Sequence, residues 1–190
     1  MIFASRNAHK RAELEQILGI GVELLPEEVE QPPEDADTFA GNALIKARAA
    51  REATGQAVIA DDSGIEVDAL GGRPGVRSAR YAGEDATDGE NLEKVLYDLA
   101  AAGGDPGARY VCVVAYIDDA GQEHLFEGTC AGRLTQDVRG DGGFGYDPAF
   151  IPEETGPDDE RTMAEVTPQE KHAISHRGKA VRDLARYLGL

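Results

Sequence analysis

The chain has 190 residues, a formal net charge of −17 and 41% hydrophobic residues. This hydrophobic content excludes a disordered chain, and the acidic balance argues against binding to nucleic acid or to anionic membranes. No apolar stretch approaches the roughly 20 residues that span a bilayer, and the apolar start Met1–Ala4 is too short for a signal peptide. We therefore expect a soluble, cytoplasmic protein with no membrane partner.

Periodicity and capping residues predict alternating strands and helices in the first part of the chain. Asn7 is placed to cap one helix and Thr38 to cap a second. The first helix carries Leu14, Ile17 and Leu18, and one face of the second carries Phe39, Ala43, Ala47 and Ala50. The other expected elements are a strand at Ile2–Ser5, an acidic loop over 26–37, and a buried strand at Ala57–Ala60 that ends at Asp61-Asp62-Ser63-Gly64.

The second part of the chain continues this alternation. A loop rich in glycine and proline covers 71–83, and Thr87 and Glu90 have the spacing of a capping box that opens a helix. The expected elements that follow are a hairpin of Tyr110–Ile117 and Gln122–Thr129, a strand at Leu134–Val138, an acidic loop at Pro152–Glu160, and a C-terminal helix with Val181, Leu184, Ala185 and Leu188. Interleaved helices and strands predict an α/β fold with a mixed central β-sheet flanked by helices. The length suggests one domain, or two lobes around one cleft, and we take residues 1–190 as a single domain.

The two cysteines lack the spacing of a metal site. In the expected hairpin Cys112 faces Glu127, so Cys112 and Cys130 are not opposite each other. We expect two free thiols in or near a sheet.

The segment between the first strand and the first helix is a candidate phosphate site. A helix N-terminus favours anions through its free N–H groups and its dipole, and the segment adds short polar side chains and a lysine. Its residues are Ser5, Arg6, Asn7, Ala8, His9 and Lys10. The alternative is an ordinary helix cap followed by a solvated basic turn.

The sequence Asp61-Asp62-Ser63-Gly64 is a candidate metal site. Magnesium in proteins is usually held by one or two carboxylates together with substrate phosphate oxygens. Alternation along a strand sends Asp61 and Asp62 to opposite sides, so we expect one of them to face a ligand. The alternative is a turn in which Asp and Ser side chains cap local N–H groups.

A glycine-rich segment, Gly142–Pro148, is a candidate base site. Its glycines allow close approach of the backbone to a ligand, and Phe144 can stack on a base. Asp147 can accept a hydrogen bond from a base or sugar, or hold the loop. The alternative is a glycine-rich hairpin loop with two packed aromatic residues.

The segment Glu170–Lys179 concentrates cations in an acidic chain. Ser175 can cap the last helix, which places His176 and Arg177 at a helix N-terminus, where cations are disfavoured. This conflict indicates an anionic or acceptor-rich ligand. The alternative is an exposed basic face.

Taken together, these segments resemble the inosine/xanthosine triphosphate pyrophosphatase family. The resemblance spans nearly the whole chain in six ordered motifs. They are Ser5-x-Asn7-x-x-Lys10, Thr38-Phe39-x-x-Asn42-Ala43-x-x-Lys46-Ala47, Ala60-Asp61-Asp62-Ser63-Gly64, Pro74-Gly75-Val76-x-Ser78-Ala79-Arg80-Tyr81-Ala82-Gly83, Gly142–Pro148, and Ala164-Glu165 with Glu170-Lys171-x-x-Ile174-Ser175-His176-Arg177. The resemblance implies two lobes around a deep nucleotide-binding cleft, a homodimer, a requirement for Mg²⁺, and hydrolysis between the α- and β-phosphates of non-canonical purine nucleotides.

The resemblance also assigns roles to residues. Asp62 corresponds to a metal ligand and proposed proton acceptor, and Lys46 is a further phosphate candidate. The implied substrate-binding residues are Ser5, Arg6, Asn7, Ala8, His9, Lys10, Ser63, Phe144, Gly145, Tyr146, Asp147, Lys171, His176 and Arg177. The family often has a metal-binding Glu where this chain has Gly41, so the metal site is expected to rely on Asp62 with Asp61, water or an acid from elsewhere. His172 replaces a commoner Asn.

We hypothesise that Mg²⁺ bridges Asp62 and the triphosphate while Lys10, Lys171 and the first helix neutralise the remaining charge. Arg177 and a protonated His176 are donor-only, so they suit a purine 6-oxo group and reject an adenine amino group. Two rival functions are a pyrophosphatase for pyrimidine or modified triphosphates, and a nucleotide-binding regulatory module that has lost catalysis, which Gly41 favours.

Overall fold

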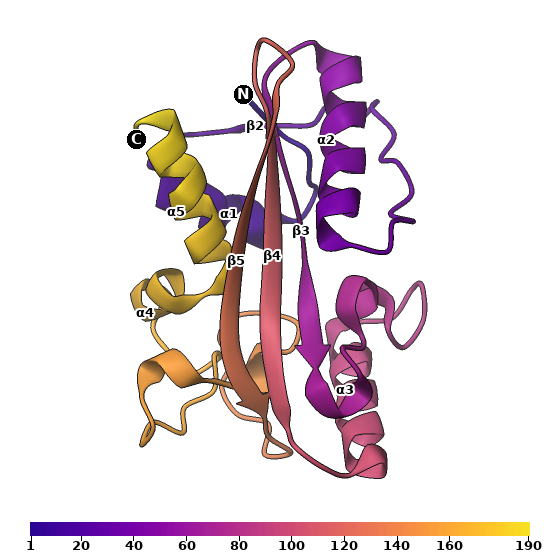
Figure 1. Ribbon diagram of the computed structural model, residues 1–190, viewed down its shortest axis with the longest axis vertical. Coiled ribbons are helices and arrows are strands. Elements are labelled where there is room, and N and C mark those ends of the chain that lie inside the picture. The colour runs from indigo at the N-terminus through magenta and orange to yellow at the C-terminus, as the bar shows by residue number, and fades with distance from the viewer. The chain divides into compact units, whose positions relative to one another are not determined.

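A computed structural model describes all residues, Met1–Leu190, and the chain forms two compact units (Figure 1). Unit 1 comprises Met1–Ser63, Cys112–Gly128 and His176–Leu190. Unit 2 comprises Gly64–Val111 and Thr129–Ser175. No helix combines the length and the apolar composition that crossing a membrane requires.

Six strands form a mixed sheet in the order β2-β1-β3-β4-β5-β6. Their bounds are β1 Ile2–Phe3, β2 Glu23–Leu24, β3 Val58–Val67, β4 Gly107–Ile117, β5 Glu123–Leu134 and β6 Phe150–Pro152. β1 is parallel to both β2 and β3, whereas β5 is antiparallel to β6. The predicted α/β class with a mixed sheet is therefore confirmed.

Unit 1 has a helix layer on each face of its strands (Figure 1). Helix α2 (Phe39–Thr54) covers one face through Ala43, Ala47 and Ala50, which pack with Val58 and Ala60 of β3. Helices α1 (Ala8–Leu18) and α5 (His176–Leu188) cover the other face, where the core contains Phe3, Leu14, Ile59, Val114, Val181 and Leu184. The caps predicted at Asn7 and Thr38 are both present.

Unit 2 is built around helix α3 (Asp88–Ala102), which begins with the predicted capping box of Thr87 and Glu90. The apolar face of α3 packs into a core with Ile65, Val67, Tyr110, Leu134 and Phe150. The unit also contains the short helix α4 (Pro168–Ile174) and four 3-10 turns, which are Asp68–Leu70, Gly75–Arg80, Asp147–Ala149 and Glu153–Thr155.

The first strand is shorter than predicted and ends at Phe3, whereas two predicted strand ends fall short of the observed ones for one physical reason. β3 does not end at Ala60 but continues to Val67, because Ile65 and Val67 carry on the buried pattern past the aspartates. β5 likewise runs unbroken to Leu134, so no separate strand occupies 134–138. Polar residues and glycines inside these strands hide their continuity in the sequence.

Neither cysteine forms a disulfide, and both lie in the sheet, Cys112 in β4 and Cys130 in β5, as predicted; both are also buried. Burial raises the pKa of Cys112 to about 12, so its thiol stays protonated at neutral pH.

Candidate active site

The segment between β1 and α1 is shaped by side chains that bond to its own backbone. Asn7 Oδ1 accepts hydrogen bonds from the amides of His9 and Lys10 at 3.0 and 3.1 Å, and Ser5 Oγ accepts one from the amide of Asn7 at 3.2 Å. Because these amides already have acceptors, the segment attracts an anion mainly through the positive end of the helix dipole and through its cationic side chains.

Two cations of this segment have different partners. Lys10 Nζ lies 3.1 Å from Asp61 Oδ2. The Arg6 guanidinium instead donates through Nη2 to the carbonyl oxygens of Glu27 and Val29, at 3.2 and 3.1 Å. Lys10 thus contacts Asp61, whereas Arg6 bonds to the backbone of the loop that follows β2. The predicted contact of Arg6 with a substrate stays a prediction.

Asp61 and Asp62 lie in the middle of β3 and face opposite sides of the sheet. Ile59, two residues before Asp61, belongs to the core under α1 and α5, whereas Ala60, two residues before Asp62, belongs to the core under α2. Alternation along the strand predicted this split, and the contacts of the two carboxylates follow it. The alternative interpretation, a turn capped by Asp and Ser, is wrong because the strand continues.

Asp61 is the centre of a buried ionic network. It is 2% exposed, and its Oδ2 accepts hydrogen bonds from Arg177 Nε and Nη2 at 3.2 and 3.1 Å in addition to the Lys10 contact. Its Oδ1 is buried without a hydrogen-bond partner. Burial alone would raise the pKa of Asp61, but the charges of Lys10, Arg177 and Lys46 hold it well below its ordinary value. Asp61 is therefore ionised at neutral pH.

Arg177 connects three elements of unit 1. It is 2% exposed, and it donates to Glu13 Oε2 of α1 at 2.7 Å and to Ser63 Oγ of β3 at 2.9 Å, besides its bonds to Asp61. His176 beside it is also buried. The structure thus gives Arg177 a bridging role between α5, α1 and β3. Its predicted bond to a purine 6-oxo group stays a prediction.

The other face of β3 carries a second charged group. Asp62 Oδ2 accepts a hydrogen bond from Asn42 Nδ2 at 3.1 Å, and Lys46 Nζ lies 3.6 Å from Asp62 Oδ1 and 2.9 Å from Glu34 Oε1. Burial raises the pKa of Asp62, and the negative charge of Glu34 raises it further. The positive charge of Lys46 lowers it, but by less, so the pKa lies above its ordinary value. Burial alone would lower the pKa of Lys46, but the negative charges of Asp62, Asp61 and Glu34 have the larger effect and raise it.

The local backbone leaves little room for a side chain at Gly41. A Cβ atom added at Gly41 would lie 2.7 Å from Ala36 Cβ and 3.0 Å from Thr38 Oγ1. The amide of Ala36 also donates to Asn42 Oδ1 at 2.9 Å, which holds the loop over the start of α2. The same loop brings Glu34 Oε1 to 2.9 Å from Lys46 Nζ.

The residues around Asp62 suit a hard divalent cation. Glu34 and Asp62 supply two carboxylates around a single ammonium, that of Lys46, and carboxylate oxygens are the ligands that Mg²⁺ takes in proteins. No group of three or more His, Cys, Asp and Glu side chains is arranged to hold a metal ion. Such a cation would therefore complete its shell with water and with oxygens of a bound anion, as Mg²⁺ commonly does.

Unit 2 gathers its predicted site residues around Asp147. This carboxylate is 4% exposed, and it accepts hydrogen bonds from Lys171 Nζ at 2.8 Å, from the Tyr110 hydroxyl at 3.1 Å and from the amide of Phe144 at 3.0 Å. Lys171 Nζ also lies 5.0 Å from the centroid of the Phe144 ring. Of the two roles considered for Asp147, these contacts favour holding the loop.

The glycine-rich loop has little freedom in this arrangement. A Cβ atom at Gly143, which has φ +72°, would lie 2.1 Å from Asp147 Oδ2. The amide of Gly145 donates to Asp88 Oδ2 at 3.0 Å, and the Tyr146 hydroxyl donates to the carbonyl of Ser78 at 2.7 Å. The loop is thus fastened to α3 and to the 3-10 turn at 75–80, which fixes where Phe144 is presented.

Several residues of these clusters were not identified from the sequence. Glu34, Glu13, Tyr110 and Asp88 contact predicted site residues, but none of them belongs to a segment singled out as a candidate site. For Glu34 a signal existed, since an acid in the loop just before the Thr38 cap can reach the first turns of α2. The others pair with residues far away in the chain, and spacing carries no information about such pairs.

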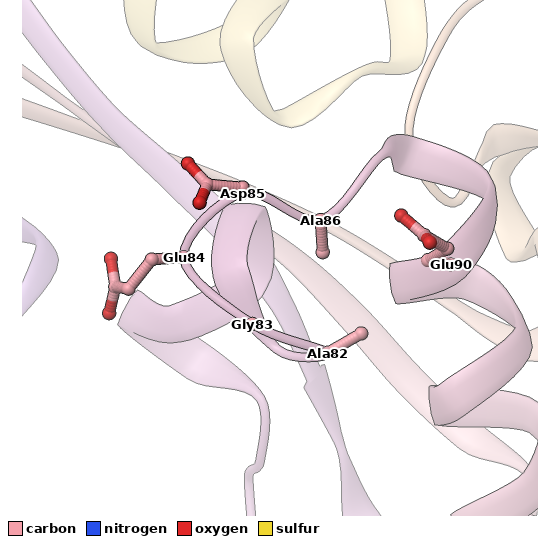
Figure 2. Close-up of a pocket in the computed structure, with 6 residues that line it drawn as sticks. All are labelled: Ala82, Gly83, Glu84, Asp85, Ala86 and Glu90. Atoms are coloured by element: carbon pink, nitrogen blue, oxygen red, sulfur yellow. The ribbon is translucent and has the colours of Figure 1, made fainter.

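A surface pocket of about 420 Å³ in unit 2 is unsuited to a polyphosphate (Figure 2). It is lined by Ala82, Gly83, Glu84, Asp85, Ala86 and Glu90. Its three charged residues are all acidic, so a phosphate group would be repelled.

Comparison with known proteins gives a consistent result. The Ham1 family pattern matches residues 1–187. A dITP/XTP pyrophosphatase from Corynebacterium diphtheriae is 45% identical, over 97% of this chain and 94% of that protein. One from Frankia alni is 46% identical, over 99% of this chain and 96% of that protein.

Solved structures agree. The structure of a HAM1 protein from Coxiella burnetii has a TM-score of 0.90 and 41% identity, covering 99% of this chain and 97% of that chain. The Ham1 protein of Staphylococcus aureus has a TM-score of 0.87 and 37% identity, covering 99% and 97%. The family resemblance drawn from the ordered motifs is confirmed, and the chain belongs to the Ham1 family.

Proposed function

We propose that this protein hydrolyses non-canonical purine nucleoside triphosphates, namely ITP, dITP and XTP, to the monophosphate and pyrophosphate. Relatives that align with this chain over nearly their full length are named dITP/XTP pyrophosphatase. The observation that carries the proposal is the gathering of Lys10 and Lys46 beside Asp61 and Asp62 in a chain of net charge −17. Such cations in an acidic protein indicate an anionic ligand.

The proposed phosphate end of the site is the unit 1 cluster. We assign the triphosphate to the segment Ser5–Lys10 together with Lys46 and Ser63, because this segment combines a helix N-terminus with cationic side chains. Asp61 orients Lys10 and Arg177, and it does not itself need to touch the substrate. Mg²⁺ is the proposed cofactor, held by Asp62 and Glu34, and when bound it would neutralise charge on the leaving pyrophosphate.

Asp62 is the proposed catalytic residue. Its carboxylate is anchored by Asn42 and faces Lys46, so it is held in a fixed place from which it can orient a water molecule toward the α-phosphorus and take its proton. Lys10 and Lys46 offset the charge that develops on the phosphate oxygens. The same carboxylate would serve as a metal ligand, and both roles predict a large loss of turnover when it is removed.

The proposed base end is the unit 2 cluster, with Phe144, Gly145, Tyr146, Asp147 and Lys171. Phe144 offers a ring face, and Lys171, whose ammonium pairs with Asp147, offers a donor suited to an oxo group. An adenine amino group would be left unpaired by such donors, which is a strong basis for discrimination. His176 and Arg177 are proposed to assist, on the family resemblance. Guanine also carries the 6-oxo group, and its rejection needs contacts near C2.

The rival function, a regulatory module without catalysis, rested on Gly41. Glu34 weakens that argument, because it supplies a second carboxylate beside Lys46 and Asp62. A residue at position 41 is therefore not needed to place two acids around one cation.

The test of the proposed function is turnover of ITP, XTP, dITP, GTP, ATP and dTTP with identification of the products. We expect the monophosphate and pyrophosphate from the first three with Mg²⁺, and no reaction with EDTA. Preference for dTTP would instead favour the pyrimidine rival, and binding of ITP without turnover would favour the regulatory module.

Three further assignments are part of the proposal. Residues 1–190 act as one pyrophosphatase domain, the protein is a homodimer, and it works in the cytoplasm. The motifs that span the chain support the first, and the family resemblance supports the second. Native mass measurement tests the dimer directly.

A further inference from the structure

Lys46 occupies an unusual position in unit 1. It is 8% exposed, and its ammonium group lies 2.9 Å from Glu34 Oε1 and 3.6 Å from Asp62 Oδ1. Asp62 Oδ2 is taken by the amide of Asn42 at 3.1 Å. The ammonium thus lies between the two carboxylates that are proposed to hold the divalent cation.

The ammonium of Lys46 and a divalent cation compete for the two carboxylates, Glu34 and Asp62. Two carboxylates and one ammonium leave a net charge of −1, which is a weak attractor for a hydrated divalent cation. If the ammonium stayed in place, a divalent cation at the carboxylates would lie within a few ångströms of it, where like charges repel strongly at low dielectric. A cation can bind well only when the ammonium moves away.

A triphosphate removes this conflict. It brings several negative charges, so the flexible lysine side chain can pair with phosphate oxygens while the carboxylates take the metal. The ammonium is then compensated in both states, first by carboxylates and afterwards by phosphate. Burial of an uncompensated charge is avoided throughout.

We infer that, in the free protein, the ammonium of Lys46 occupies the place between Glu34 and Asp62 and hinders binding of a divalent cation there. The divalent cation therefore binds together with the nucleotide. This inference rests on the proposed function. It assigns Lys46 a positioning role, in which the lysine couples metal affinity to the presence of substrate.

The experiment measures Mn²⁺ binding by titration calorimetry in the absence of nucleotide. We expect weak binding to the wild type, and an affinity about tenfold or more higher in Lys46→Met, which removes the competing charge and keeps the length of the side chain. Lys46→Arg, which keeps the charge, should bind as weakly as the wild type. Lys94→Met is the matched control, because Lys94 also pairs with a carboxylate, Asp98, at 3.0 Å.

A second readout is thermal stability. Lys46→Met leaves two carboxylates uncompensated, so its Tm should fall without metal and recover when Mn²⁺ is added, whereas the Tm of the wild type should change little. If the methionine variant does not fold, Lys46→Gln serves in its place. The gain in Mn²⁺ affinity should disappear in the double variant with Asp62→Asn.

Equal Mn²⁺ affinity in wild type and Lys46→Met would overturn the inference, as would a gain that survives Asp62→Asn. Neither result concerns turnover. Absence of ITP hydrolysis by the wild type would instead overturn the proposed function, so the two failures are distinguishable.

Discussion

Asp61 and Asp62 are neighbours in the chain with opposite environments. Asp61 is compensated by Lys10 and Arg177, and its pKa is held well below the ordinary value, whereas burial raises the pKa of Asp62. The first is a fixed counter-charge, and the second is a carboxylate that bonds to Asn42 and faces Lys46 and that is proposed to bind the metal. Replacing each residue by asparagine should therefore have different consequences.

Asp62→Asn should lower the turnover of ITP by about 100-fold or more while the protein stays folded. Asparagine keeps an oxygen that can accept from Asn42 but loses the charge and the basicity. The measurement is kcat together with Tm. Near-normal turnover would contradict the assignment of Asp62.

Asp61→Asn should instead cost stability, about 3–5 kcal/mol at neutral pH, because Arg177 and Lys10 lose their shared counter-charge. The folded pKa of Asp61 lies below its unfolded value, so this stabilisation is present above about pH 4 and is lost as pH falls toward the folded pKa. The gap in urea unfolding free energy between wild type and variant should narrow by about 1 kcal/mol at pH 3. A difference in unfolding free energy that does not change with pH would contradict this role of Asp61.

At the residue scale, the sequence predicts what local geometry determines. Asn7 was identified from its place before a helix, and the split between Asp61 and Asp62 followed from strand alternation. Glu13 could not be identified in this way, because its partner, Arg177, is brought to it by packing of α1 and α5, which no spacing in the chain records. For Glu34 the only signal was its place in the loop just before the Thr38 cap.

At the scale of elements, the contact between α5 and β5 decides where the start of α5 lies. A Cβ atom added at Gly128 of β5 would lie 2.1 Å from the carbonyl oxygen of His176 and 2.7 Å from the amide of Ala180. Only a glycine lets the first turn of α5, with Arg177, approach the strand this closely.

Gly128→Ala should therefore destabilise the protein by about 1–3 kcal/mol through overpacking. Because the first turn of α5 must move, activity toward ITP should also fall. Gly89→Ala in α3 is the matched control, since a Cβ there meets no atom within 4 Å and alanine favours a helix. Urea unfolding of both variants makes the comparison, and equal stability of the two would argue against a close contact at Gly128.

Strand ends were harder to predict than helix starts. Capping residues mark where α1, α2 and α3 begin, and all three caps are where the sequence indicates. β3 and β5 contain aspartates, a serine or glycines in their interiors, and these residues are typical of turns. Burial by the surrounding layers outweighs that local preference.

At the scale of the whole molecule, three strands belong to both units. β3, β4 and β5 each begin in one unit and end in the other, so the loss of either unit would break the hydrogen bonding of strands that the other needs. We expect a single unfolding transition in urea, with the same midpoint by far-UV circular dichroism and by tyrosine fluorescence. Two separated transitions would contradict the proposal of one domain.

The chain has a net charge of −17, yet a small group of cations lies on both faces of β3 in unit 1. In the free protein these cations are compensated by carboxylates, and in the proposed complex they would pair with the polyphosphate, whose cleaved bond is proposed to lie near Asp62.

The most direct test of this account is hydrolysis of ITP in water labelled with ¹⁸O, followed by mass spectrometry of both products. Attack on the α-phosphorus predicts one labelled oxygen in the monophosphate and an unlabelled pyrophosphate. Label in the pyrophosphate, or release of inosine diphosphate and inorganic phosphate, would show that the bond broken is not the one that this site is proposed to cleave.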